Sequence, residues 1–244
     1  MSFINKFKQS VSNQTSLNSK IGYALSEIIL LVIGILIAVS INNWNEQRTR
    51  NNELNNILKI IKSDLEDDVE ASIRIQNIYS GYKTYVEAVL SKQVDRDYYN
   101  KNPKMAFVIR GFPELYLHRR GYGLLQAYID SEELSNDSLV GQIAAFYTTS
   151  TQSVRADDKL RGQDQQDNFI NWKNNQPWWP EYIYSQKIDG FIEYAIDDPD
   201  YINRVASFYL IHYKAFLPEL TKYKKDAEAL IEMIKAKEKR DNAI

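Results

Sequence analysis

One apolar stretch constrains this chain more than any other feature. Residues 21–41 read IGYALSEIILLVIGILIAVSI, and Glu27 is the single charged residue among them. A helix rises about 1.5 Å per residue, so this stretch reaches roughly 30 Å, the thickness of the hydrocarbon core of a bilayer. The sequence therefore predicts one transmembrane helix here, and the rest of the chain must be arranged on either side of it.

Two alternative interpretations of this stretch are less favoured. Ala38-Val39-Ser40 resembles the small-x-small cleavage site of a signal peptide, but the leader would be unusually long and would carry Glu27 in its apolar region. A buried core helix would contain more polar residues, whereas residues 28–41 contain only Ser40. We therefore expect the segment to be retained as an anchor.

A narrow stripe of polar and small residues runs along the predicted transmembrane helix. At 100° per residue, four positions share this arc, and they are Tyr23, Glu27, Gly34 and Ala38. Small residues allow two helix backbones to approach closely in lipid, and a carboxyl group there needs a partner or a proton. The stripe is thus a candidate contact face for a membrane protein partner or a second copy. The alternative is that Glu27 lies near the lipid headgroups, bonded to the Tyr23 hydroxyl.

Basic residues on the two flanks of the span suggest its orientation. Residues 1–20 contain lysines and no acid, while the basic residues after the span alternate with glutamates. The positive-inside rule then predicts a cytoplasmic tail at 1–20, the transmembrane helix at 21–41 and a periplasmic domain at 42–244 of a bacterial inner-membrane protein.

The composition favours an all-α fold. Nine Gly and six Pro are few beside the abundant Leu, Ile, Ala, Lys and Glu, which suits long helices better than a sheet with tight turns. Apolar residues at helical spacing predict an elongated bundle of three to four long helices, built mainly from 44–92, 137–173 and 199–240. The first of these can continue unbroken from the membrane helix, and Asp198-Pro199 is typical of a helix start. A short extended piece is expected at 107–110.

Two segments carry a resemblance to a known family. YALSEIILLVIGILIAVSINNWNEQR, residues 23–48, resembles the N-terminal signature of an uncharacterised family of single-span membrane proteins found mainly in flavobacteria and their relatives. LLQAYIDSEELSNDSLVGQIAAFYT, residues 124–148, is similar to a second helical segment of that family. The resemblance implies an inner-membrane anchor followed by an extracytoplasmic helical domain. It brings no activity and no catalytic residues.

Several kinds of chemistry are disfavoured by what the sequence contains. The absence of Cys removes thiolate nucleophiles and Cys-based metal sites, and the two histidines, His118 and His212, lie on separate segments. Neither a phosphate-binding glycine pattern nor a serine-nucleophile motif occurs, so no metal or cofactor is predicted. A net charge of −2 with mixed signs disfavours nucleic acid. An enzyme with paired carboxylates stays open, because nothing singles out one pair.

Two clusters outside the span are candidate contacts for a ligand or partner. Arg119 and Arg120, next to His118, form the densest positive charge and can bind a carboxylate or phosphate group; alternatively, the acids of residues 64–70 pair with them. Trp178 and Trp179 stand between prolines, and three interpretations are open: a binding lid, a plug at the end of the bundle, or a contact with the membrane surface. His212 falls in an apolar stripe and is interpreted as a hydrogen-bonded core residue.

These observations lead to a hypothesis and two alternatives. The favoured one is a membrane-anchored, non-enzymatic interaction or accessory subunit that uses the stripe of the transmembrane helix. The second is an extracytoplasmic sensor that binds a ligand in a polar groove along residues 150–168, under the Trp178-Trp179 turn. The third, least favoured, is a membrane-anchored hydrolase.

Overall fold

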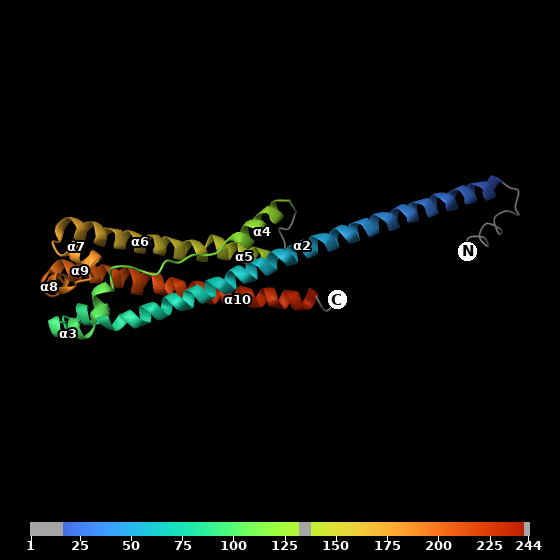
Figure 1. Cartoon of the computed structure of the whole chain (residues 1–244). Coiled ribbons are helices and arrows are strands. Elements are labelled where there is room, and N and C mark those ends of the chain that lie inside the picture. Colours follow the sequence, from blue (N-terminus) through green and yellow to red (C-terminus); the bar gives the residue numbers. More distant parts are fainter. Residues whose placement is uncertain (1–16, 132–137, 242–244) are drawn as a thin grey trace. The chain divides into compact units, whose positions relative to one another are not determined.

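Helix α2 (Leu17–Leu90) is the longest element of the protein and continues without a break through the predicted span into the first predicted bundle helix (Figure 1). The computed structural model describes residues 17–131 and 138–241, so most of the predicted tail lies outside the described residues. The chain divides into two compact units, Met1–Asn55 and Asn56–Ile244. The expectation that the two helices are one is confirmed.

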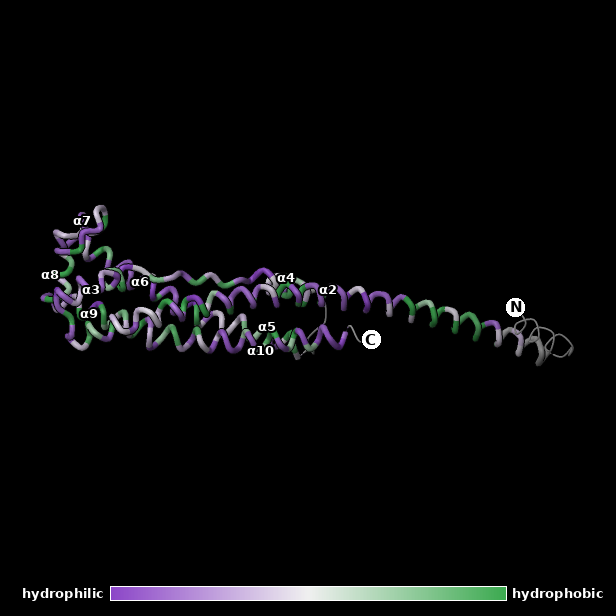
Figure 2. The backbone as a smooth tube through the Cα atoms, turned by 60° about the horizontal axis from the view of Figure 1, so that its bottom comes forward, coloured by the Kyte–Doolittle hydropathy of each residue, from purple (hydrophilic) through white to green (hydrophobic). Residues whose placement is uncertain are grey.

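The described part of the first unit is entirely helical and strongly apolar. Figure 2 shows the hydrophobic stretch near the N-terminal end of α2. Among the described residues, one helix is long and apolar enough to cross a membrane, and its most apolar 18-residue window is 0% buried. By length and composition, this helix is compatible with membrane anchoring.

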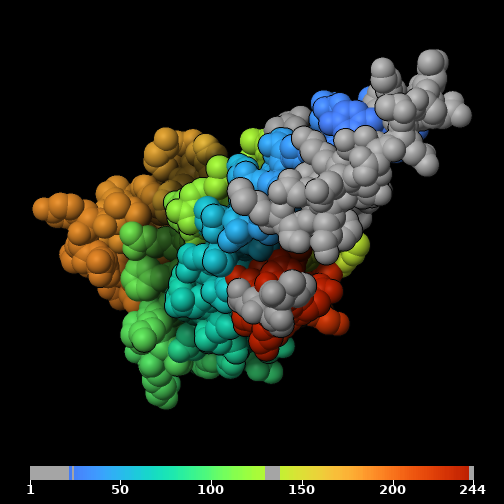
Figure 3. Space-filling view, turned by 90° about the vertical axis from the view of Figure 1, so that its right-hand side faces the viewer, coloured from blue at the N-terminus to red at the C-terminus, as the bar shows by residue number. Residues whose placement is uncertain are grey.

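The second unit is built from three long helical rods. They are residues 56–90 of α2, α6 (Ser150–Asn175), and a C-terminal rod made of α9 (Pro199–Phe208), the π-helical η2 (Tyr209–Phe216) and α10 (Leu217–Asp241). The rods lie side by side along the unit (Figures 1 and 2). Figure 3 shows the cyan part of α2 flanked by the red α10 and by the green segment that follows α2.

Shorter helices close the ends of this bundle. Near one end lie α3 (Arg96–Lys101), the 3-10 helix η1 (Pro103–Phe107), α7 (Trp179–Tyr184) and α8 (Asp189–Asp197). Toward the other end lie α4 (Arg120–Ser131) and α5 (Ser138–Thr148). No strand occurs within residues 17–131 and 138–241, which confirms the predicted all-α class.

The core is formed by stripes at helical spacing, as the sequence predicts. One row of buried positions on α2 advances alternately by three and four residues: Leu58, Ile61, Leu65, Asp68, Ser72, Ile75 and Tyr79. Such a 3.5-residue period keeps one face toward a partner helix. Each fully buried Leu or Ile contributes about 1.5–3 kcal/mol. Two of these seven positions are polar, so the bundle contains buried groups that need specific partners.

The C-terminal rod buries every apolar position that its periodicity predicts, from Tyr201 to Ile234. Between Phe208 and Leu220 the buried positions recur every four residues, a spacing that drifts by about 40° per step on an α-helix. The wider π-helical turns of η2 offset this drift. Pro218, which lacks an amide hydrogen, is the second residue after the π-helical segment ends at Phe216.

Three details differ from the expectations. The predicted helix over 137–173 is two helices, because the chain breaks at Thr149. The extended segment covers 111–119 and not 107–110, since η1 and a turn occupy the earlier residues. The helices α7 and α8 were not predicted, because each is short and rich in aromatic residues. In contrast, the Asp198 side chain caps α9 by accepting from the Asp200 amide at 2.9 Å, as expected.

Candidate functional site

The predicted stripe lies on the apolar part of α2 and is uncovered within the described chain. A Cβ atom placed on Gly34 would meet nothing within 4 Å, and the Tyr23 side chain is 41% exposed. Glu27 is exposed as well. The stripe therefore leaves room for another helix, but its contact with a partner stays a prediction.

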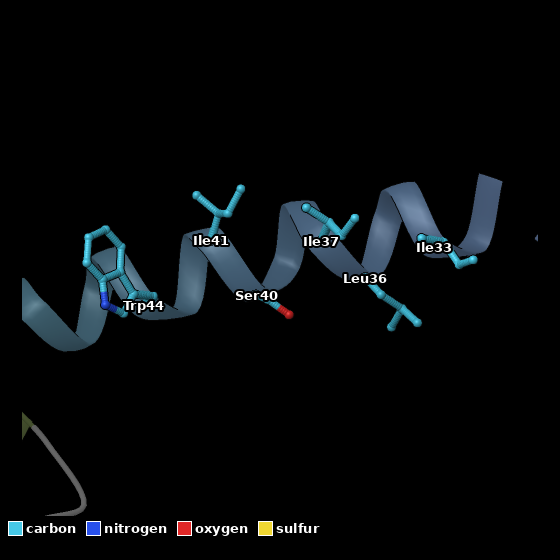
Figure 4. A pocket seen from close by; sticks show the side chains of 6 residues that line it. All are labelled: Ile33, Leu36, Ile37, Ser40, Ile41 and Trp44. Atoms are coloured by element: carbon cyan, nitrogen blue, oxygen red, sulfur yellow. The ribbon is translucent and has the colours of Figure 1, made fainter. Parts of the chain in front are cut away.

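A shallow hollow on the same helix has the same character. Its six side chains are Ile33, Leu36, Ile37, Ser40, Ile41 and Trp44. Figure 4 shows that all of them project from successive turns of α2 alone. With only one helix as its wall, this hollow is an apolar surface that lipid or another protein would cover, and it is no enclosed ligand pocket.

Two carboxylates of α2, one helical turn apart, hold the start of α4. Asp64 Oδ2 accepts a hydrogen bond from the backbone N–H of Gly121 at 2.8 Å. Asp68 Oδ1 accepts two hydrogen bonds from His118, one from the backbone N–H at 3.0 Å and one from the ring Nδ1 at 2.7 Å. A negative charge near the first turn of a helix satisfies free amides and opposes the positive end of the helix dipole. The carboxylates thus act as caps supplied by a neighbouring helix.

The Asp68 carboxylate also reaches the C-terminal rod. The Tyr223 hydroxyl donates to Asp68 Oδ2 at 2.7 Å. Burial raises the pKa of Asp68, while the hydrogen bonds from Tyr223 and His118 lower it in part. The same bond to Asp68 raises the pKa of His118. One buried carboxylate therefore joins α2, α10 and the segment before α4.

The pairing of the basic triplet with the acids of residues 64–70 is present in the structure. Besides the His118 contact, Arg120 lies 3.6 Å from Asp64, and the Arg119 guanidinium lies over the Tyr122 ring at 5.5 Å. These contacts give the triplet a structural role in fixing α4. A further contact of Arg119 and Arg120 with a ligand or partner stays a prediction.

A buried arginine forms the polar centre of the second unit. Arg161 of α6 is 0% exposed, and its guanidinium lies 3.7 Å from the centre of the Phe216 ring and 4.5 Å from that of Phe112. It donates to Asp158 Oδ1 at 2.6 Å and to the Tyr79 hydroxyl at 2.8 Å. The charge is thus paired and hydrogen-bonded, as a buried charge requires. Sequence reasoning missed this cluster.

His212 completes the cluster from the π-helical segment. Its Nδ1 atom lies 2.6 Å from the Tyr79 hydroxyl, and its ring stacks on Phe208 with 3.9 Å between ring centres. Burial, and then the charge of Arg161, lower the pKa of His212 to about 3. The interpretation of His212 as a hydrogen-bonded core histidine agrees with this geometry.

An open groove of about 520 Å³ lies beside this cluster. Its walls come from α2, the segment from η1 to Pro113, and α6. The lining residues are Ile78, Tyr82, Phe107, Arg110, Gly111, Phe112, Pro113, Gln165 and Phe169. The volume falls in the range of small-molecule sites. Of the predicted polar stretch 150–168, Gln165 lines this groove.

The tryptophans at the end of the bundle pack on each other and on phenylalanine and tyrosine rings. Trp172 is 0% exposed and donates through Nε1 to the Tyr194 hydroxyl at 3.1 Å. Trp178 lies between the rings of Trp172, Phe191 and Tyr194 at 5.3–5.8 Å. This arrangement favours the plug over the lid, and a role of Trp178 and Trp179 in binding a partner stays a prediction.

Comparison with known proteins gives one family. The protein-family model described as "Family of unknown function (DUF6090)" matches residues 27–95. The match runs from Glu27 through the rest of α2 to Asp95, the N-cap residue of α3. An uncharacterised family is consistent with the resemblance seen in the sequence. No curated protein and no solved structure matches the chain.

Proposed function

We propose that the protein is a membrane-anchored, non-enzymatic interaction or accessory subunit. Its transmembrane helix binds a membrane protein partner or a second copy, and its helical domain lies in the periplasm. The observation that carries this proposal is a carboxyl group and a glycine on one stripe of an uncovered apolar helix, where nothing in the described chain lies within 4 Å of a Cβ at Gly34.

Lipid alone accounts poorly for this stripe. The Leu, Ile and Val side chains from Leu25 to Ile41 are 45–63% exposed and are suited to acyl chains. A carboxyl group is different, because an acidic side chain in a membrane helix costs free energy, roughly 3 kcal/mol at the bilayer centre and less toward the headgroups. A partner helix that offers a donor to Glu27 removes part of that cost, and Gly34 lets the two backbones approach.

The residues that flank the span support the proposed orientation, with the helical domain in the periplasm. Trp44 is 62% exposed, and the Arg48 guanidinium lies over its ring at 5.7 Å. Indole rings and flanking basic residues gather at the level of the lipid headgroups, so we expect the membrane boundary near this turn of α2. The purely basic residues before the span then favour the cytoplasm for the N-terminus.

Substitutions in the stripe test the proposed contact. We expect Gly34→Leu and Glu27→Leu to reduce, by roughly tenfold, the amount of partner retained after mild detergent extraction of native membranes. Val32→Leu adds bulk on the opposite face of the same helix and serves as the matched control. Co-expression of two differently tagged copies separates self-association from a foreign partner. Complexes unchanged by both stripe substitutions would exclude the proposed contact.

The absence of cysteine makes the orientation easy to measure. A single thiol introduced as Tyr184→Cys replaces a side chain that is 94% exposed in the second unit. We expect a membrane-impermeant maleimide to label it in intact spheroplasts, and a thiol introduced as Thr15→Cys to react only after lysis. The reverse pattern would place the domain in the cytoplasm.

A further inference from the structure

The groove beside Arg161 combines aromatic walls with one positive charge. Four rings line the groove: Tyr82 from α2, Phe107 from η1, Phe112 from the segment that follows η1, and Phe169 from α6. Each of these side chains is half-buried. Ile78 is 40% exposed and contributes an aliphatic wall. Such a surface is suited to a flat apolar group that stacks between rings.

Arg110 supplies the charge at the groove. Its guanidinium lies 5.5 Å from the centre of the Phe107 ring and 5.4 Å from that of Tyr182. Within the described residues, the ion pairs join other basic groups, and the Arg110 guanidinium has no carboxylate partner. A half-buried guanidinium without an acid attracts an anion, and its planar fork of donors matches a carboxylate.

The wall that contains Arg110 is held in place from behind. Gln165 Nε2 donates to the Arg110 carbonyl oxygen at 3.0 Å, and an Arg161 Nη atom donates to the Pro113 carbonyl oxygen at 2.8 Å. Gly162 of α6 lies against the Phe112 ring, since a Cβ there would be 3.6 Å from the ring tip, an ordinary van der Waals contact. A wall fixed by partly buried hydrogen bonds reduces the entropy lost when a ligand binds.

We infer that this groove binds a small arylalkyl carboxylate. The aromatic ring of the ligand stacks among Tyr82, Phe112 and Phe169, and its carboxylate pairs with Arg110. This inference goes beyond the proposed function, because it needs no contact of the transmembrane helix. It assigns a ligand-binding capacity to the second unit.

The test uses the full chain in phosphatidylcholine nanodiscs and 4-(4-fluorophenyl)butanoate as the probe, observed by fluorine NMR. We expect the probe signal to broaden beyond its width with empty nanodiscs, and the corresponding neutral amide to bind about tenfold more weakly, since the amide has no negative charge to pair with the Arg110 guanidinium. A probe signal equal to that with empty nanodiscs would overturn the inference.

Variants locate the site. Arg110→Gln weakens binding of the carboxylate about tenfold and leaves binding of the amide unchanged, whereas Arg110→Lys, which keeps the charge, loses less. Ile78→Trp fills the groove from α2 and abolishes binding of both molecules. Arg74→Gln, at an exposed ion pair of the same helix, is the control and binds like the wild type. An Arg110→Gln variant with wild-type circular dichroism and unchanged carboxylate affinity would contradict the inference.

Discussion

Tyr79 and His212 meet in the interior of the second unit, with 2.6 Å between the Tyr79 hydroxyl and His212 Nδ1. Arg161 Nε also donates toward this nitrogen, at 3.3 Å. Because a guanidinium can only donate, Nδ1 must be an acceptor, and the ring carries its proton on Nε2. The site therefore holds a neutral imidazole and disfavours imidazolium.

This arrangement predicts acid sensitivity with a defined sign. The unfolded chain protonates His212 near pH 6.5, whereas the folded chain holds its pKa at about 3. Between pH 6.5 and 3 the unfolded chain binds a proton at His212 that the folded chain does not. The free energy of unfolding therefore has its full value above pH 6.5 and decreases by about 1.4 kcal/mol per pH unit as the pH falls toward 3. Urea unfolding of the wild type and of His212→Gln, followed by tryptophan fluorescence between pH 4 and 7, measures it. Equal pH slopes for both proteins would refute the prediction.

At Gly121, helix α4 approaches α2 too closely for a side chain to fit between them. A Cβ atom there would lie 2.7 Å from the backbone nitrogen of Ile61 on α2, closer than atoms pack. Gly121→Ala must therefore push α4 away from α2 and lengthen the hydrogen bond to Asp64, at a cost of about 1–3 kcal/mol. Gly123→Ala, on the same helix with nothing within 4 Å, is the control and should gain about 0.5–1 kcal/mol. Comparable urea midpoints for the two variants would argue against this contact.

His118 has the opposite pH dependence from His212. Its hydrogen bond to Asp68 raises its pKa, with smaller contributions from the charges of Asp68, Asp64 and Asp67. The stability from this pair is fully present below the unfolded pKa, near pH 6.5, and is lost as pH rises through the folded pKa. We expect the unfolding midpoint of the wild type to fall between pH 6 and 8 more than that of His118→Gln. A wild-type midpoint that rises relative to the variant over this range would contradict the assignment.

The long helices were predictable because their buried positions repeat at a fixed spacing. The stripe from Tyr201 to Ile234 needs no knowledge of the partner helix, since burial of one face follows from the period alone. The pairing of the acids near Asp64 with the basic triplet was also foreseen, because opposite charges concentrated on two segments favour a contact. Both inferences use properties visible in one segment at a time.

The groove and the buried Arg161 could not be predicted in the same way. Arg161 lies on the buried face of α6 together with Val154, Asn168 and Trp172, but only Val154 and Trp172 are apolar, so apolar spacing does not mark this face. The partners of Arg161 also come from α2 and the C-terminal rod, 82 and 51 residues away along the chain. The groove likewise depends on where the extended segment 111–119 crosses the bundle. Tertiary packing, and not local spacing, creates both.

Gly190 gives a last prediction at the aromatic end of the bundle. A Cβ at this position would lie 2.6 Å from the Trp178 Cβ atom, so Gly190→Ala must displace Trp178 from its place beside Phe191 and Tyr194. We expect a loss of about 1–3 kcal/mol, together with a red shift of the tryptophan emission, because the indole becomes more exposed to water. Gly141→Ala, with nothing within 4 Å on α5, is the control that should leave the emission unchanged. Emission spectra of the two variants that match the wild type would show that Trp178 is not confined by Gly190.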